Sequence, residues 1–342
     1  MCPVSNEEIT EYFDVLSEEW PKFIDKYLEV SVLKRLSKIG QFCGCEYTRL
    51  HNCKYWYSRL DHSVATALMT WNFTQDKAQT LGALFHDLGT PAFSHCVDFM
   101  LGDALDQESA ERDVKDILLG SEELLRCLSE DKVSVEEVAE IQKYTVVENK
   151  KPKLCVDRLE GVLHTGLIWC GFWSLEEVAE IYRDVVVLVN EDGEDEIGFG
   201  SLEVAERFYD GCVKYSLAMD ANEDKFVLQF VADNVRRLIE SGVLTHGDLY
   251  EKSEAEIIKL IKVDAELRSE WERFERAEVL KRGSKRPAKG YFIGGIKAKK
   301  RYVVPLVEVD GKAARLDEVS EVCRELLEGY LEFEDSRFAW IE

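Results

Sequence analysis

Three of the six histidines in the chain lie within one stretch, residues 59–98. His62 comes first, His86 follows it and directly precedes Asp87, and His95 lies near the end of the stretch. Imidazole and carboxylate groups together suit borderline divalent metals such as Zn, Mn, Fe, Co and Ni. A metal ion with open coordination positions can activate water for hydrolysis. We therefore interpret this stretch as the beginning of a metal site.

A fourth ligand is expected further along the chain, at Asp157. This residue is set inside a mostly apolar helical pattern, residues 154–169, and a buried carboxylate without a partner is costly. Together with His62, His86 and Asp87 it would give two neutral and two anionic ligands, whose charge balances a divalent ion. The predicted cofactor is therefore one divalent metal ion or more, with Mn, Mg, Zn, Fe, Co and Ni as candidates.

The elements that must hold these residues are helices. The apolar spacing in residues 76–88 predicts a helix that carries His86 and Asp87 in its last turn. Gly89 and Pro91 then end the helix. A pair of ligands at the end of a rigid helix is held more precisely than a pair on a free loop.

Helical periodicity recurs along most of the chain, whereas residues 40–58 lose it and predict a loop that is functional or buried against a site. Residues 190–200 predict a solvated acidic turn. The other helical stretches are 7–39, 63–73, 99–105, 109–119, 134–144, 154–169, 174–189, 202–217, 224–241, 252–281 and 316–330.

A change of composition near residue 282 marks the one candidate boundary in the chain. We expect a helical domain, 1–281, followed by a basic hairpin and a helix, 282–342, packed on the same domain. The hairpin is expected from 291–293 and 301–309, with Pro305 marking an edge strand. The predicted class is all-α, with this small hairpin in the C-terminal region.

The charge of the chain limits its partners. A formal net charge of −24 makes nucleic-acid binding a poor expectation, and an anionic substrate would need a local positive pocket. The longest aliphatic run, residues 185–189, is too short to span a bilayer, so we expect no membrane partner and a cytoplasmic location. Ten cysteines fit free thiols in a reducing compartment, with a structural zinc on Cys43, Cys45 and Cys53 as the alternative.

Three motifs resemble the HD-domain metal-dependent phosphohydrolases. They are RLDHS at 59–63, HDLGTPAFSH at 86–95 and VDRLE at 156–160, and VLKRLSKIGQ at 32–41 adds to them. They are most similar to the deoxynucleoside triphosphate triphosphohydrolase (dGTPase-like) branch. The resemblance covers residues 33–167 and implies a helical HD-domain bundle. It also implies a set of four metal ligands: His62, His86, Asp87 and Asp157.

The resemblance also implies roles for residues around the metal. His95 and Asp98 match positions near the scissile phosphate, Arg59 and Arg158 match phosphate contacts, and Gln41 matches a sugar contact. The implied reaction is attack on phosphorus by a metal-activated hydroxide, with His95 protonating the leaving oxygen. The implied substrate is a deoxynucleoside triphosphate, cleaved to nucleoside and triphosphate.

The chain departs from that branch at several positions. Thr90 stands where the branch has histidine, and Gln107-Glu108 stands where it has a His-Glu pair. Gly161 and Thr165 replace an aromatic residue and an acid. Either Glu108, or Asp98 acting through His95, could supply the acid–base role.

The alternatives are therefore a phosphomonoesterase or phosphodiesterase for another nucleotide, including signalling nucleotides, or a degenerate nucleotide-binding sensor. A homo-oligomer is expected in each case.

Two further features have more than one interpretation. His164 lies two helical turns after Asp157, where it could reach the cleft or be a buried core histidine. The basic segment 281–301 is an anion-binding flap, a subunit contact or a solvated loop.

Overall fold

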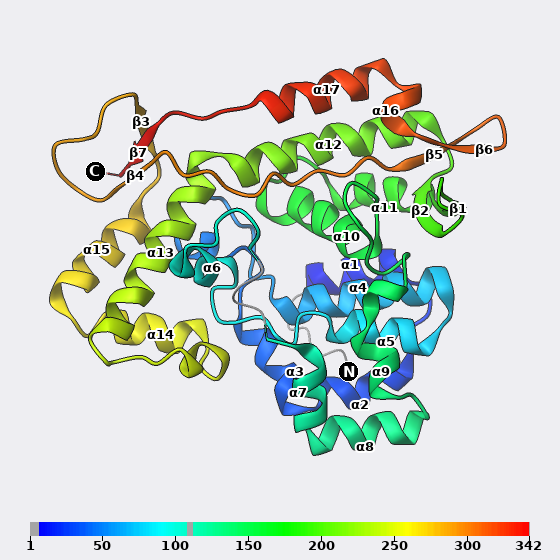
Figure 1. Ribbon diagram of the computed structural model, residues 1–342, viewed down its shortest axis with the longest axis horizontal. Helices are drawn as coiled ribbons and strands as arrows, with labels where there is room; N and C mark the ends of the chain where they lie inside the picture. Colours follow the sequence, from blue (N-terminus) through cyan, green and yellow to red (C-terminus); the bar gives the residue numbers. More distant parts are fainter. Residues whose placement is uncertain (1–6, 108–111, 342) are drawn as a thin grey trace.

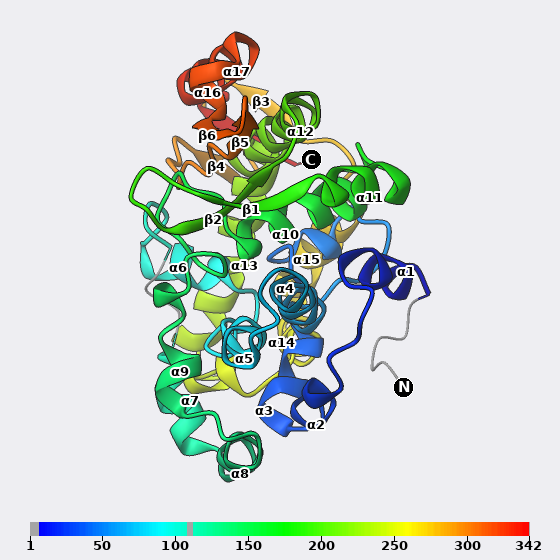
Figure 2. The ribbon, with the colours of Figure 1, turned by 90° about the vertical axis from the view of Figure 1, so that its right-hand side faces the viewer.

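The fold is built around one buried helix. The computed structural model describes residues 7–107 and 112–341. Its central helix, α4 (Arg59–Thr74), packs against α5 (Lys77–Phe85), α10 (Val156–His164) and α1 (Glu7–Leu16). Figure 2 shows α4 nearly end-on with these three helices around it.

The sequence around residue 58 explains where α4 begins. The Ser58 side chain accepts a hydrogen bond from the Asp61 backbone N–H, and the Asp61 carboxylate accepts one from the Ser58 N–H. This capping box starts the helix at Arg59, earlier than the predicted start at residue 63. Arg59 and His62 therefore share one face of the first turn.

The remaining helices surround this centre, as Figure 1 shows. Among the described residues they are α2 (Asp25–Leu28), α3 (Ser31–Lys34), α6 (His95–Leu101), α7 (Val114–Gly120), α8 (Glu122–Asp131), α9 (Val135–Ala139), α11 (Leu175–Arg183), α12 (Leu202–Asp220), α13 (Asn222–Glu240), α14 (Glu254–Ile261), α15 (Ala265–Arg276), α16 (Leu316–Val319) and α17 (Glu321–Glu332). The long helices predicted over 7–39 and 252–281 are each divided into shorter helices. None of the helices in the described part of the chain is long and apolar enough to cross a membrane.

Two small sheets complete the described fold. One has the strand order β1-β2-β5-β6, and the other has the order β3-β7-β4. Their bounds are β1 (Val185–Val189), β2 (Asp195–Phe199), β3 (Lys281–Gly283), β4 (Phe292–Gly294), β5 (Leu306–Val309), β6 (Lys312–Arg315) and β7 (Phe338–Trp340). The predicted class, mainly helical with a small hairpin near the C-terminus, is confirmed, and the hairpin is β5–β6.

Some details of the predicted strands and helices are wrong. The helix expected over 174–189 ends at Arg183, because the β-branched run that follows forms β1. The acidic segment 190–200 is not a solvated loop throughout, since β2 pairs with β1 and buries four of its five residues.

The expected pairing of 291–293 with 301–309 is also wrong, because β4 pairs with β7 and β5 pairs with β2 and β6. Pro305 does not mark an edge. It precedes the first residue of an interior strand, where the missing N–H breaks no ladder bond.

The segment between β4 and β5, residues 295–305, is extended and is called the strap below. Figure 1 shows it in orange, running alongside α12. The Lys299 N–H donates to the Ala104 carbonyl at 3.1 Å, and the Val304 N–H donates to the Pro152 carbonyl at 2.7 Å. The strap is thereby tied both to the segment after α6 and to the segment before α10.

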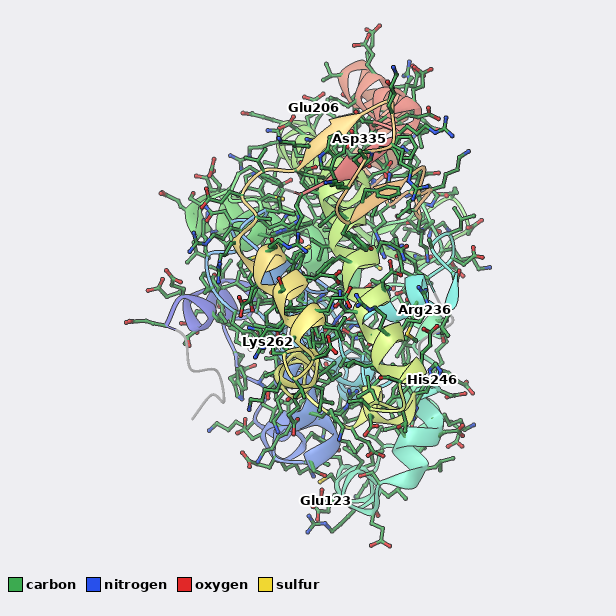
Figure 3. The ribbon with its side chains drawn as sticks, turned by 90° about the vertical axis from the view of Figure 1, so that its left-hand side faces the viewer. Glu123, Glu206, Arg236, His246, Lys262 and Asp335 are labelled. Atoms are coloured by element: carbon green, nitrogen blue, oxygen red, sulfur yellow. The ribbon has the colours of Figure 1, made fainter. Side chains whose placement is uncertain are left out.

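Helices α6 and α13 pack against each other, and an arginine adds a hydrogen bond between them. Arg236, labelled in Figure 3, donates from α13 to the Met100 carbonyl at 2.8 Å. The start of α6 carries His95, so this contact helps to fix one wall of the site described next.

Candidate metal centre and its cavity

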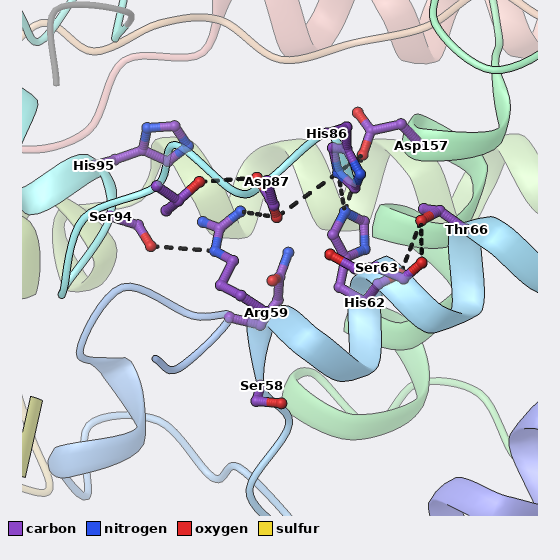
Figure 4. A network of polar contacts seen from close by, with 12 residues as sticks. Ser58, Arg59, His62, Ser63, Thr66, His86, Asp87, Ser94, His95 and Asp157 are labelled. Atoms are coloured by element: carbon purple, nitrogen blue, oxygen red, sulfur yellow. Dashed lines mark hydrogen bonds and ion pairs between the residues drawn. The ribbon is translucent and has the colours of Figure 1, made fainter. Parts of the chain in front are cut away.

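The four predicted metal ligands converge in space. His62 Nε2 lies 3.0 Å from Asp157 Oδ1 and 3.2 Å from His86 Nε2. His86 Nε2 lies 3.5 Å from Asp157 Oδ1 and 3.7 Å from Asp87 Oδ2. They come from α4, the turn after α5 and the first turn of α10, and Figure 4 shows them facing one point.

The hydrogen bonds of the two imidazoles suit a metal at that point. His86 Nδ1 lies 2.6 Å from the Ala83 carbonyl, and His62 Nδ1 contacts the Glu160 carboxylate. When each Nδ1 carries the proton for these acceptors, both Nε2 lone pairs face the shared point. A His-His-Asp-Asp donor set arranged in this way fits a divalent ion. None of the cysteines in the described residues joins a group of possible metal ligands.

The electrostatic field at this point favours positive charge. Burial would lower the pKa of His62, but the Glu160 and Asp157 carboxylates raise it to about 10. Burial would raise the pKa of Asp157, but the two imidazoles hold it well below its usual value. The Asp157 side chain is 34% exposed and lies at the cavity surface, so an ion could reach the donors from there.

Asp87 is held by two neighbours. Arg59 Nη1 lies 3.0 Å from Asp87 Oδ2, and the Thr90 hydroxyl donates to Asp87 Oδ1 at 3.0 Å. Burial opposes ionisation of this carboxyl, but Arg59 and the two histidines lower its pKa well below the usual range. The helix that was predicted to carry His86 and Asp87 ends at Phe85. The pair therefore lies in the turn that follows the helix.

Glu160 is a functional candidate that the sequence reasoning missed. Its fully buried carboxylate accepts hydrogen bonds from Tyr57 at 2.6 Å and Tyr12 at 3.2 Å. It also contacts His62 Nδ1, and it lies 2.7 Å from His164 Nδ1. Burial would raise its pKa, but the two imidazoles lower it to about 2. The sequence did hold a signal for Glu160, because it is a second acidic residue, three positions after Asp157, in a mostly apolar helix.

A cavity of about 1250 Å³ opens beside the metal donors. Its walls combine cationic, acidic and aromatic side chains. Eight predicted site residues line it: Gln41, Arg59, His62, His86, Asp87, His95, Asp157 and Arg158. Other lining residues are Phe42, Cys43, Gln107, Arg112, Lys115, Glu148, Lys150, Lys151, His164, Thr165, Tyr215, Asp224, Lys299 and Arg301.

His95 and Asp98 form a pair at the start of α6. His95 Nδ1 lies 3.0 Å from Asp98 Oδ2, and Asp98 is only 1% exposed and does not line the cavity. Burial lowers the pKa of His95 to about 4, and the charges of Arg301 and Arg59 act in the same direction. The ring is therefore neutral at neutral pH. Glu108, the other predicted acid–base residue, lies outside the described residues.

Arg158 and Gln41 have different surroundings. Arg158 reaches the cavity, but its guanidinium donates to Glu148 at 2.7 Å and to the carbonyls of Asn149 and Lys153. Gln41 Oε1 is a buried oxygen with no hydrogen-bond donor among the described residues. That oxygen could accept a hydrogen bond from a ligand hydroxyl.

The segment that carries Gln41 is held by two acids, the partly buried Glu46 and the buried Glu254. Glu46 accepts from the N–H groups of Phe42 at 2.7 Å and Gly44 at 3.0 Å. Glu254 accepts from the Phe93 N–H at 2.9 Å and the Tyr47 hydroxyl at 2.8 Å. A Cβ at residue 40 would lie 2.4 Å from Glu46 Oε1, so any other residue there would displace this carboxylate. The loop predicted over 40–58 does reach the site, through Gln41, Phe42 and Cys43.

The comparisons with known proteins show a common fold. The crystal structure of a phosphohydrolase from Bacteroides thetaiotaomicron VPI-5482 matches with a TM-score of 0.62 and 13% identity, covering 92% of this chain and 94% of that one. A hypothetical protein from Aquifex aeolicus matches with a TM-score of 0.58 and 14% identity, over 92% and 91% of the two chains. The chain therefore has the fold of this phosphohydrolase.

Sequence comparison adds one relative. The protein YdhJ of Bacillus subtilis (strain 168) is 23% identical over 241 residues, which cover 70% of each chain. No family model matches the chain.

Proposed function

We propose that the chain is an HD-type, metal-dependent phosphohydrolase that acts on a nucleotide. The preferred candidate substrate is a deoxynucleoside triphosphate, cleaved to nucleoside and triphosphate. One observation carries the proposal: donor atoms of His62, His86, Asp87 and Asp157 face one point on the wall of a cavity of about 1250 Å³. Small-molecule sites usually occupy about 300–1,000 Å³, so this cavity can enclose a nucleotide.

A divalent ion held by these four residues would polarise a phosphoryl oxygen and lower the pKa of a bound water. The chain itself supplies positioning. Arg59 and Thr90 fix both oxygens of Asp87, while Glu160 fixes the ring of His62. His95, in its neutral form, can donate from Nδ1 to Asp98 and present Nε2 to the reacting groups.

The rest of the cavity offers groups for a nucleoside. Gln41 Oε1 can accept from a sugar hydroxyl, because it has no other donor among the described residues. Phe42 and His164 lie with their ring centroids 5.4 Å apart on the cavity wall. Such rings suit a flat, partly apolar base.

The test is metal analysis followed by a substrate panel. Purified protein is assayed for bound metals and then incubated with Mn²⁺, Co²⁺ or Mg²⁺ and a set of deoxynucleotides, ribonucleotides and signalling nucleotides. Chromatography distinguishes released triphosphate from released phosphate. We expect Asp157→Asn to lose both metal and activity. The control is Asp210→Asn, which changes an exposed carboxylate paired with Lys214 and should keep both.

The sensor alternative has one observation in its favour. Thr90 and Gln107 occupy positions where the resembling branch has histidines, and both are buried and engaged in hydrogen bonds. A protein that retains its metal and binds a nucleotide without any turnover would favour the sensor. If neither metal nor nucleotide binds, both proposals fail.

A further inference from the structure

The arginines of the HD-like motifs are already paired inside the protein. Arg59 is engaged with Asp87 through a buried ion pair, and Arg158 with Glu148. Each of these guanidinium groups therefore has a carboxylate partner before any ligand arrives. In a protein of net charge −24, a polyanionic ligand needs further positive charge in the cavity.

Arg301 supplies a cation of a different kind. It lines the cavity, is only partly buried, and donates from Nη2 to the neutral amide oxygen of Gln107. No carboxylate of the described residues forms an ion pair with it. A partly buried guanidinium without a counter-ion is costly, and its planar fork matches phosphate oxygens.

The strap determines which side chains face the cavity. On the strap, the residues that line the cavity are Lys299, Arg301, Tyr302 and Val303. Lys300 turns away to Asp220 at 2.6 Å and to the carbonyls of Tyr330 and Phe333. The Arg301 N–H also donates to the Tyr330 hydroxyl at 3.0 Å. The backbone at Arg301 is therefore fixed from the side away from the cavity.

The charge of Arg301 acts on groups from three helices. It helps to lower the pKa of His95 on α6. It also opposes the burial that raises the pKa of Tyr215 on α12 and of Asp224 on α13. All three of these groups line the same cavity as Arg301.

We propose that Arg301, carried over the cavity by the strap, contacts a phosphate of the bound substrate, and that Gln107 is the positioning residue that holds it beforehand. The inference rests on the proposed function for the nature of the ligand, a phosphate compound. It gives the basic C-terminal segment a role in the site, and it explains a use for Gln107 where the resembling branch has histidine.

The experiment measures binding of a phosphate probe that cannot be hydrolysed. Methylenediphosphonate is titrated calorimetrically into the full-length protein, with and without Mn²⁺. We expect Arg301→Gln to weaken binding by about tenfold to a hundredfold, the usual effect of losing hydrogen bonds to a charged group. The affinity of Arg301→Lys should lie between those of wild type and Arg301→Gln, because lysine keeps the charge but lacks the planar fork. Mn²⁺ content and the thermal midpoint report that each variant is folded.

The matched control is Arg286→Gln, which removes the same charge from the same basic segment. Arg286 packs over the Phe292 ring and does not line the cavity, so binding should not change. For Gln107 the readout is a double-mutant cycle. Gln107→Glu should weaken binding by giving Arg301 a carboxylate partner, and it should cause no such loss once Arg301 is glutamine.

Two results would overturn the inference: wild-type protein that does not bind the probe in either condition, or Arg301→Gln that binds as wild type does. Arg301-dependent binding in a protein that hydrolyses no nucleotide would keep this inference and remove the proposed function. If the protein hydrolyses a nucleotide but Arg301→Gln and Arg301→Lys leave KM unchanged, the proposed function is kept and this inference is removed.

Discussion

The Thr90 hydroxyl donates a hydrogen bond to Asp87 Oδ1 at 3.0 Å. The other oxygen of the same carboxylate, Oδ2, lies 3.0 Å from Arg59 Nη1. Asp87 is therefore held at both oxygens, and the plane of its carboxylate is fixed. Thr90, one of the residues that depart from the HD pattern, therefore orients a candidate metal ligand in this chain.

This relationship predicts the metal affinity of variants at Thr90. Thr90→Val keeps the shape but removes the hydroxyl, so one oxygen of Asp87 loses its donor. Groups that orient metal ligands typically account for about 10–100-fold in affinity. We expect a loss in that range for Mn²⁺, measured by calorimetry. Thr90→Ser keeps the donor and should bind Mn²⁺ nearly as wild type does, and equal losses in both variants would show that the hydroxyl is not responsible.

A second prediction concerns Glu160, which accepts from two tyrosines and contacts two histidines while fully buried. Glu160→Gln removes the charge and turns an N–H₂ group toward groups that are themselves donors. Removing one partner of a buried ionic network costs on the order of 3 kcal/mol, so the thermal midpoint should fall by several degrees. Metal affinity should fall as well, because the ring of His62 loses its orientation.

The control for Glu160 is a glutamate on the surface. Glu180 pairs with Arg207 at 2.8 Å, and both side chains are well exposed. Exposed pairs contribute about 0–1 kcal/mol, so Glu180→Gln should leave the thermal midpoint and the metal affinity almost unchanged. A Glu160→Gln protein as stable as this control would show that the network is not important for stability.

The sequence predicted the helices well where an apolar stripe repeats, as in α4, α5 and α10. It failed where tertiary pairing decided the conformation. The residues Val185–Val189 continue the helical periodicity of the preceding residues. They nevertheless form β1, because this β-branched run pairs with a neighbouring strand. The pairing of β4 with β7 joins segments that are distant in the chain, and no local pattern reports such a partner.

The candidate site divides in the same way. The four predicted metal ligands do converge, because their motifs set both their types and the helix ends that carry them. Glu160 and Arg301 were missed for different reasons. In the sequence, Glu160 is one charged residue of a mostly apolar helix. Its hydrogen-bond partners Tyr12 and Tyr57 lie over 100 residues away, so no local pattern indicates them. Arg301 was one of many basic residues, and only the path of the strap distinguishes it.

A third prediction concerns the dependence of stability on pH. Burial, and then the nearby Glu46 carboxylate, raises the pKa of Glu254 from 4.5 to about 8. The folded protein therefore binds a proton here more tightly than the unfolded chain does. This favours the folded state at pH below 4.5, and the benefit is lost progressively as pH rises from about 4.5 to about 8.

The matched variant is Glu254→Gln, which cannot ionise. Its amide oxygen can still accept from the Phe93 N–H, and its N–H₂ group can donate to the Tyr47 hydroxyl oxygen. In thermal unfolding measured from pH 5 to 8.5, the midpoint of wild type should fall more steeply than that of the variant. The variant should be the more stable of the two at pH 8.5. Parallel curves would mean that Glu254 does not titrate in this range.

The last prediction concerns the protonation state in which His95 works. Burial lowers its pKa to about 4, so the free protein carries a neutral ring at pH 7. Since Nδ1 faces Asp98 Oδ2 at 3.0 Å, the proton of the neutral ring belongs on Nδ1 and the lone pair on Nε2. Before substrate binds, His95 therefore presents an acceptor nitrogen, Nε2. A bound phosphate would raise its pKa by adding negative charge nearby.

The pH dependence of kcat/KM distinguishes these states, because this constant reports groups of the free enzyme. If neutral His95 is the active form, kcat/KM falls on the acid side with a pKa near 4, and titration of His95 adds no pH dependence at pH 6–8. If the protonated form is required, kcat/KM falls about tenfold per pH unit above the same pKa.

His95→Gln should lower kcat by about 10²–10⁴-fold, as expected for loss of an acid–base group. His246→Gln, at an exposed histidine labelled in Figure 3, should leave kcat and its pH profile unchanged.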